Sequence, residues 1–207
     1  MLKNYFLIAI RNLKKFKTFS FINIAGLSIS LAIVILIVLY AEMELSMNKF
    51  HKNYNYIYKV GNGTTPAPIA DIIKLNLPEI KNVARIESFR TTSVTVKYGE
   101  KVLTVKNLIF SDQDFFDIFT FPIVSGNIKT ALKNPMSLVL NETEAKRIFG
   151  KENPINKVVK LDNEFDFYVK AVIKDIPKNS SMQFSSIASF ISIKTMTGNA
   201  NNDPFNW

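Results

Sequence analysis

Cysteine is absent from this sequence of 207 residues, and histidine occurs once, as His51. The absence of cysteine excludes a disulfide framework, a thiol nucleophile and a cysteine-ligated zinc or iron–sulfur centre. A single histidine likewise excludes a multi-histidine metal site. The sequence has no Gly-x-Ser-x-Gly motif, and Gly61-Asn62-Gly63 is not followed by the Gly-Lys-Ser/Thr of a P-loop. We therefore expect that the chain is not an enzyme and holds no cofactor or metal.

Acidic residues are missing from the stretch before Glu42, although the whole chain carries 17 of them. Basic residues are present in that stretch, all before Phe21: Lys3, Arg11, Lys14, Lys15 and Lys17. Much of the net charge of +9 is therefore concentrated at the N-terminus. Such a cluster could bind nucleic acid, but the apolar segment that follows it favours a membrane surface instead. We expect no nucleic-acid partner.

Residues 21–41 contain no charged side chain. A helix of this length, rising about 1.5 Å per residue, matches the roughly 30 Å hydrocarbon core of a bilayer. A cleaved signal peptide has a shorter apolar region and a small-residue cleavage site, whereas Ala41, Glu42 and Met43 follow this segment. A buried helix of a soluble protein would show a polar face. We therefore predict a retained transmembrane helix at 21–41.

The charges on either side of this helix predict its orientation. Basic residues precede it, Glu42 and Glu44 follow it, and lysine- and arginine-rich flanks stay in the cytoplasm. We expect a cytoplasmic N-terminus and a periplasmic location for the residues after about 42. Apolar residues at helical spacing in residues 1–20 predict a basic amphipathic helix that contacts membrane lipid at the cytoplasmic face. A plain basic anchor is the alternative.

Small residues lie in the first half of the predicted span. Gly26 and Ser30 are four positions apart, so both would lie on one side of a helix. Such a small-xxx-small face lets another transmembrane helix approach closely. A generic span that happens to contain small residues explains the same pattern, and both interpretations stay open.

Residues 42–207 have the mixed pattern of an α+β domain. The first half of this region predicts β-forming residues at 54–60, a helix at 69–77 that Pro78 ends, and strands at 83–89, 92–98 and 101–110. Gly99 stands at the first turn position between the last two strands and indicates a hairpin.

A short helix is predicted to follow Ser111. Ser111 and Asp114 have the spacing of a capping box, and aromatic residues follow at 115–119. Asp112, Asp114 and Asp117 are spaced closely enough to suggest calcium, but the glycine and glutamate of an EF-hand loop are absent. We assign two of these carboxylates to the helix start, where the helix dipole favours them.

The second half of the region predicts another strand, another helix and a hairpin. A strand at 137–140 ends at Asn141, which with Glu144 indicates the start of a helix that runs to Phe149. Gly150 then ends this helix in a left-handed conformation. The last hairpin is predicted at 157–161 and 165–176, before Pro177.

Several segments resemble one known family. The N-terminus of MacB/FtsX-type ABC-transporter permeases, especially the group common in Bacteroidota, resembles MLKNYFLIAIRNLKKFKTFSFINIAGLSISLAI and ELSMNKFHKNYNYIYKV here. The MacB-like periplasmic core domain of that family is similar to LPEIKNVARI, FFDIFTFPIVSGNIKTALKNPMSLVLNETEAKRIFGKENPINKVVKLD and KAVIKDIPKNSSMQF. The resemblance covers nearly the whole chain in order. Where the family often has Tyr-Asp after Glu-Leu-Ser, this chain has Met47-Asn48.

This resemblance implies a permease subunit of a bacterial inner-membrane transporter. It implies that residues 42–207 are a MacB-like periplasmic core domain, incomplete at the C-terminus. Such permeases couple a separate cytoplasmic ATP-binding subunit to the extracytoplasmic domain by mechanotransmission, for export or extraction of substrates. The partners implied are that ATP-using subunit, a second permease copy in a dimer, membrane lipid and a periplasmic adaptor.

The membrane-exit stalk implied by the resemblance contains Glu44, Leu45, Ser46, Phe50 and His51. We expect a structural or interfacial role for His51. Two other classes of function compete with the permease. One is a single-pass membrane-anchored binding or sensor module, and the other is an anchored hydrolase, which would have to use His51 as its base.

Overall fold

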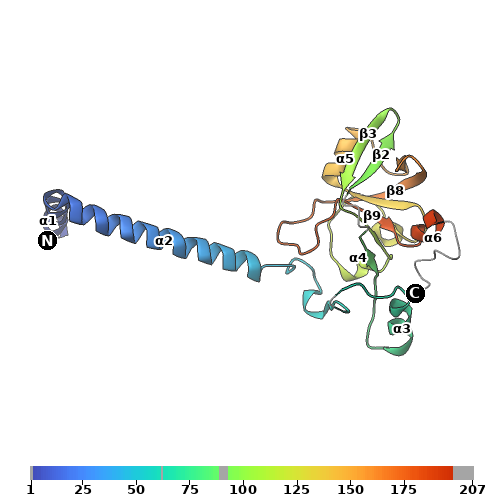
Figure 1. The fold of residues 1–207 in the computed structure, drawn as a ribbon, viewed down its shortest axis with the longest axis horizontal. Helices are drawn as coiled ribbons and strands as arrows, with labels where there is room; N and C mark the ends of the chain where they lie inside the picture. Colours follow the sequence, from blue (N-terminus) through green and yellow to red (C-terminus); the bar gives the residue numbers. More distant parts are fainter. Residues whose placement is uncertain (1, 62, 89–92, 198–207) are drawn as a thin grey trace. The chain divides into compact units, whose positions relative to one another are not determined.

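The computed structural model describes residues 2–61, 63–88 and 93–197, and the chain divides into two compact units, Met1–Met47 and Asn48–Trp207. The first unit consists of helices α1 (Leu2–Lys15) and α2 (Lys17–Leu45) (Figure 1). The predicted interfacial helix is therefore shorter than expected, because residues 17–20 begin the second helix. Within the described residues, α2 is the one helix long and apolar enough to cross a membrane. It contains the predicted span and buries no side chain.

The second unit is built on a mixed β-sheet. Its strands are β1 (Ile86–Glu87), β2 (Ser93–Tyr98), β3 (Lys101–Lys106), β4 (Leu108–Ser111), β5 (Ile123–Gly126), β6 (Ser137–Asn141), β7 (Val158–Leu161), β8 (Phe165–Ile173) and β9 (Ser186–Ser189). Their order in the sheet is β1-β4-β9-β6-β8-β7-β2-β3, with β5 also paired to β8. The pairs β4–β9 and β6–β8 are parallel, and the others are antiparallel.

The central strands are buried on both faces of the sheet, which explains why they are continuous apolar runs. In β6, Leu138 and Leu140 join one hydrophobic cluster, whereas Val139 between them joins the other. Successive side chains of a strand point to opposite faces, so each face of the sheet has its own core. The predicted class, an apolar N-terminal helix followed by a mixed α+β domain, is confirmed.

Four α-helices and two 3-10 turns accompany this sheet in the part of the chain that the structure describes: α3 (Ile69–Asn76), α4 (Phe115–Ile118), α5 (Glu142–Phe149), α6 (Ser192–Thr197), η1 (Tyr54–Tyr56) and η2 (Ile128–Thr130). Helix α5 packs beside β3 and α6 beside β9 (Figure 1). The start and end predicted for α5 are confirmed. The side-chain oxygen of Asn141 accepts a hydrogen bond from the Glu144 amide at 2.8 Å, and Gly150 has a φ of +66°.

One predicted strand is in fact two. Residues 101–110 divide at Asn107, whose φ is +55°. A left-handed residue redirects the chain, and asparagine adopts this conformation more readily than most side chains. As a result β3 pairs with β2 at one edge of the sheet, while β4 pairs with β1 and β9 near the opposite edge. The hairpin itself is confirmed, with Gly99 at a φ of +58°.

The predicted capping box at Ser111 is wrong. Ser111 belongs to β4, and its hydroxyl donates a hydrogen bond to the Arg85 carbonyl at 2.7 Å. Asp114 occupies the N-cap position of α4, but its side chain caps nothing and instead forms an ion pair with Lys74 at 2.7 Å. Tertiary partners therefore take both side chains away from the local role that their spacing suggests.

Three further differences concern strands. The strand predicted at 83–89 is reduced to Ile86–Glu87, and Phe89 lies outside the described residues. The β-forming stretch 54–60 begins with the 3-10 turn η1 and forms no strand. The hairpin of β7 and β8 is confirmed but is not the last sheet element, because β9 follows it and pairs within the centre of the sheet. The short sequence of β9, half of it serine, carries little strand signal.

An ion pair fixes the edge strand β1 to the start of α4. The side chain of Asp112 accepts three hydrogen bonds from Arg85, from the backbone amide at 2.9 Å and from Nε and Nη2 at 2.8 Å each. The Arg85 guanidinium also lies 4.4 Å from the centre of the Phe190 ring. A two-point hydrogen-bonded pair of this kind, between a guanidinium and a carboxylate, is both directional and strong.

We predict that Asp112→Asn lowers the free energy of unfolding by about 2 kcal/mol, because charged hydrogen bonds are lost in a partly buried place. The measurement is chemical denaturation in detergent, followed by circular dichroism. Asp166→Asn is the matched control, since its pair with Lys160 spans 3.0 Å but is 39% and 55% exposed. Exposed pairs contribute about 0.5 kcal/mol or less. Equal losses in the two variants would contradict the assignment.

Candidate functional site at the membrane anchor and stalk

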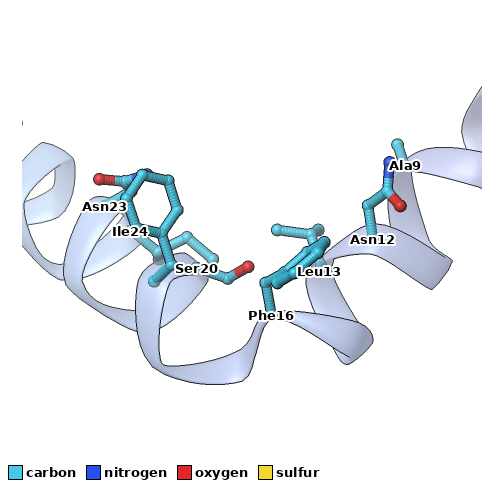
Figure 2. Close-up of a pocket in the computed structure, with 8 residues that line it drawn as sticks. Ala9, Asn12, Leu13, Phe16, Ser20, Asn23 and Ile24 are labelled. Atoms are coloured by element: carbon cyan, nitrogen blue, oxygen red, sulfur yellow. The ribbon is translucent and has the colours of Figure 1, made fainter.

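The five basic residues of the N-terminus are all exposed. Lys3, Arg11, Lys14 and Lys15 lie on α1, and Lys17 is the first residue of α2. The two helices meet at a bend at Phe16, and Lys15 Nζ lies 5.5 Å from the centre of the Phe16 ring. Figure 2 shows the open notch in this bend, of about 410 Å³, which is lined by Ala9, Asn12, Leu13, Phe16, Phe19, Ser20, Asn23 and Ile24.

Gly26 and Ser30, the residues of the predicted packing face of α2, are connected by a hydrogen bond within the helix. The Ser30 hydroxyl donates a hydrogen bond to the Gly26 carbonyl at 2.9 Å. This bond satisfies the hydroxyl without a second helix, as serine does in apolar surroundings. A Cβ added at Gly26 would meet no atom within 4 Å. The side of the helix that carries these residues is therefore open in this unit.

The predicted stalk residues divide between the two units. Glu44 and Leu45 are the last residues of α2, and the Ser46 amide continues the helical ladder by donating to the Glu42 carbonyl at 3.0 Å. Phe50 and His51 belong to the folded unit, which begins at Asn48. The structure therefore brings Phe50 and His51 together with the domain core and does not join them with the other three.

Asn48 fastens the chain to the loop between β8 and β9. Its backbone amide donates to the Asn179 carbonyl at 2.8 Å. Its side-chain oxygen accepts from the Ser181 amide at 2.9 Å, and its side-chain nitrogen donates to the Ser181 hydroxyl at 2.8 Å. Asn48 has a φ of +60°, a conformation in which asparagine is enriched. An aspartate here could not donate the last of these bonds.

His51 fastens the chain to the loop after α4. The residue is 2% exposed, and its Nδ1 accepts a hydrogen bond from the Thr120 amide at 3.0 Å. The Thr120 hydroxyl in turn accepts from the Lys52 amide at 3.1 Å. Three aromatic rings surround the imidazole, those of Phe50, Phe119 and Phe121, at centroid distances of 4.0, 5.2 and 5.4 Å. We call Asn48, His51 and Lys52, with Thr120, Asn179 and Ser181, the stalk clamp.

Burial lowers the pKa of His51. Since Nδ1 accepts a hydrogen bond, the neutral ring carries its proton on Nε2, which has no hydrogen-bond partner among the described residues. Protonation of Nδ1 would break the bond to Thr120 and place a cation among apolar rings. The imidazole is therefore held neutral as part of the packing.

Sequence reasoning identified His51 and Phe50 but missed most of the stalk clamp. Asn48 was noted only as a departure from a family pattern, and Thr120, Asn179 and Ser181 were not noted at all. Ser181 and Asn48 are 133 positions apart, and Thr120 and His51 are 69 apart. No periodic or local pattern connects residues at such separations, so only the fold identifies them as partners.

The chain has an apolar helix of membrane-spanning length. The mixed-sheet domain that follows forms hydrogen bonds with the residues just after this helix. These features define a membrane-anchored domain of the α+β class. The profile of the family described as the MacB-like periplasmic core domain matches residues 20–205. The chain belongs to this family, which is found in the permeases of ABC transporters. The predicted resemblance is thereby confirmed. A search of curated protein sequences finds no match.

Solved structures show the same fold. A domain of a permease protein from Porphyromonas gingivalis matches with a TM-score of 0.53 at 20% identity, over 67% of this chain and 61% of that one. The extracellular domain of the noncanonic ABC-type transporter YknZ from Gram-positive bacteria matches with a TM-score of 0.51 at 18% identity, over 67% and 70%. The periplasmic region of MacB from Actinobacillus actinomycetemcomitans matches with a TM-score of 0.51 at 21% identity, over 66% and 60%. The chain thus spans about three fifths of the first and third of these domains.

We predict that the stability of the domain falls as the pH drops below about 6.5, the ordinary pKa of histidine. The unfolded chain takes up a proton on His51 there, whereas the folded chain, whose pKa is lower, does not. The free energy of unfolding then decreases by up to about 1.4 kcal/mol per pH unit until the folded-state pKa is reached.

The measurement compares chemical denaturation of the wild type and of His51→Asn between pH 5.5 and 7.5. The asparagine oxygen can accept from the Thr120 amide but does not titrate, so carboxylate effects cancel in the comparison. We expect the difference in stability between the two proteins to change with pH below 6.5. A difference that stays constant over this range would show that the histidine is not held neutral.

Proposed function

We propose that this chain is the N-terminal part of a MacB/FtsX-type permease subunit in which the stalk clamp passes movement of the anchor helix to the core domain. The observation that carries this proposal is the pair of attachments at Asn48 and His51, directly after the unit that contains the anchor. A force applied to the chain at Met47 reaches the domain within one to four residues. A short, hydrogen-bonded connection transmits displacement, whereas a long flexible linker would absorb it.

The two attachment loops are themselves tied to the core. Thr120 lies between Phe119 and Phe121, and the Phe121 ring stacks parallel to that of Phe115, which is fully buried at the centre of the second hydrophobic cluster. In the other loop, Met182 packs against the same cluster and Phe184 is a buried member of it. Because packed cores deform little, displacement of either loop moves the sheet with it.

The energy source in this proposal is a separate cytoplasmic ATP-binding subunit. The membership of this chain in an ABC-permease family and the resemblance of its N-terminus support this partner, as well as a second permease copy and a periplasmic adaptor. The chain contributes no catalytic group of its own to the process. In support, the side chain best suited to general base catalysis, His51, is buried and uses Nδ1 to hold Thr120. Substrates would be moved or extracted on the outer side of the membrane.

The orientation in this proposal has a basic cytoplasmic end and an exported domain. We predict that a reporter enzyme active only outside the cytoplasm is active when fused after Lys101 and inactive when fused at Lys15, because positive flanks stay inside. Enzyme activity in intact cells is the measurement, with immunoblots to confirm equal amounts of both fusions. Activity at Lys15 and silence at Lys101 would mean that the topology is inverted.

A single fluorescent dye can report the transmitted movement. Because the natural chain has no cysteine, the dye attaches only to one introduced cysteine. We predict that ATP changes the fluorescence of an environment-sensitive dye on Lys49→Cys, an exposed position beside the stalk clamp, in native membranes that contain the partner subunits. Adding Asn48→Ala should at least halve this change, because it removes hydrogen bonds to Ser181 that stabilise the attachment by about 1–2 kcal/mol.

Asn55→Ala is the matched control, because Asn55 is exposed and lies in the same segment without taking part in the stalk clamp. Circular dichroism verifies that each variant remains folded. A dye that does not respond to ATP in the wild-type background contradicts mechanotransmission and favours an anchored binding or sensor module. A full response in Asn48→Ala means that the stalk clamp does not carry the movement.

A further inference from the structure

The unit formed by α1 and α2 carries an excess of positive charge beside the open notch at its bend. Over residues 1–41 the chain has five basic residues and no acidic one. Three of these cations, Lys14, Lys15 and Lys17, lie within two positions of Phe16, where the two helices meet. Positive charge immediately before a membrane-spanning helix attracts the headgroups of anionic lipids.

The two sides of α1 differ in character, and the notch lies on the apolar side. Ala9, Asn12 and Leu13 line the notch, and their spacing of three or four positions places them on one side of the helix. At about 100° per residue, Arg11 and Lys14 fall on the opposite side. Such a helix lies in the membrane interface with its apolar side toward the hydrocarbon. The notch therefore opens toward lipid acyl chains, and the cations lie toward the headgroups.

The length of α2 places the notch near the level of the lipid glycerol and phosphate groups. A hydrocarbon core of about 30 Å takes up roughly 20 helical residues. Counted back from Ala41, the last residue before Glu42, these residues begin at Ile22. Ser20 and Asn23, which line the notch on the α2 side, thus lie at the boundary between hydrocarbon and headgroups.

The notch also contains polar side chains that lack a partner. Asn12 lies on its α1 side, and Ser20 and Asn23 lie on its α2 side (Figure 2). Among the described residues, the side-chain amides of Asn12 and Asn23 have no hydrogen-bond partner. An amide in apolar surroundings is unfavourable unless it is hydrogen-bonded. The phosphate and ester oxygens of a phospholipid are acceptors for the two amide nitrogens.

We propose that the notch binds one anionic phospholipid. The acyl chains pack against the apolar lining, which consists of Ala9, Leu13, Phe16, Phe19 and Ile24. The phosphate and ester oxygens accept hydrogen bonds from Asn12 and Asn23, and the negative headgroup contacts the lysines at the bend. Lys15 is already beside the notch, since its Nζ lies 5.5 Å from the centre of the Phe16 ring. A second helix could fill the apolar part of the notch but would leave the cations without counter-charges.

Native mass spectrometry of the full chain in a mild detergent tests the choice of lipid. Phosphatidylglycerol and phosphatidylcholine with the same acyl chains differ chiefly in the net charge of the headgroup. We expect one phosphatidylglycerol molecule to bind at least ten times more tightly than phosphatidylcholine, because the lysines attract a net negative headgroup. Equal affinities would overturn the proposal and mean that the notch takes any acyl chain. A dimer that excludes lipid would overturn it as well, because a second copy would then fill the notch.

Paired variants test the place of binding. Asn12→Leu combined with Asn23→Leu should lower the affinity for phosphatidylglycerol at least fivefold, and Lys15→Gln at least threefold. Asn4→Leu and Lys3→Gln are the matched controls, because both residues are exposed on α1 and do not line the notch. These controls should change the affinity less than twofold. Equal losses in variants and controls would show that the lipid binds elsewhere.

Two features of the design keep the results unambiguous. Circular dichroism verifies that each variant remains helical, and the comparison of the two lipids uses only the wild type, so it holds even if a variant fails to fold. The leaflet that supplies the lipid follows from the orientation in the proposed function. Binding in detergent requires neither that orientation nor ATP, so its failure is distinct from an inverted topology or from a failure of ATP-driven transmission.

Discussion

The attachment of residues 48–52 to the folded domain is the constraint on which a mechanical role depends, and its energetics are unusual. The hydrogen bond that Thr120 donates to His51 contributes about 1 kcal/mol, whereas a buried nitrogen without a partner costs about 1–3 kcal/mol. The described residues offer His51 Nε2 no such partner. A phenylalanine would fill the aromatic pocket without that cost but could not accept from Thr120. The histidine therefore contributes a defined geometry more than it contributes stability.

The sheet holds in place the two loops to which residues 48–52 attach. One loop follows α4, whose Phe115 is fully buried, and the other connects β8 to β9 in the centre of the sheet. Strand β8 pairs with β5, β6 and β7, so it is held along its whole length. Both loops thus leave rigid elements of a core that is buried on two faces. This arrangement allows a displacement at the membrane exit to act on the domain as a body.

Exposed apolar side chains are distributed unevenly over the surface of the domain. Residues 93–197 bury their apolar side chains in two clusters, while residues 54–86 leave Tyr56, Tyr58, Ile72 and Leu75 exposed. The matched part of this chain covers 60–70% of the solved domains of similar fold. Surface of this kind is suited to contact with another polypeptide.

The sequence by itself determined the elements whose causes are local. The anchor helix follows from uninterrupted apolar residues, the ends of α5 from Asn141 and Gly150, and the β2–β3 turn from Gly99. It also determined the family, through motifs spread along the chain. Only the tertiary structure decided that 101–110 divides at Asn107, that β9 enters the sheet, and that Ser111 and Asp114 serve Arg85 and Lys74. It alone joined Asn48 to Ser181 and His51 to Thr120, because hydrogen bonds between residues far apart in the chain leave no periodic signal in the sequence.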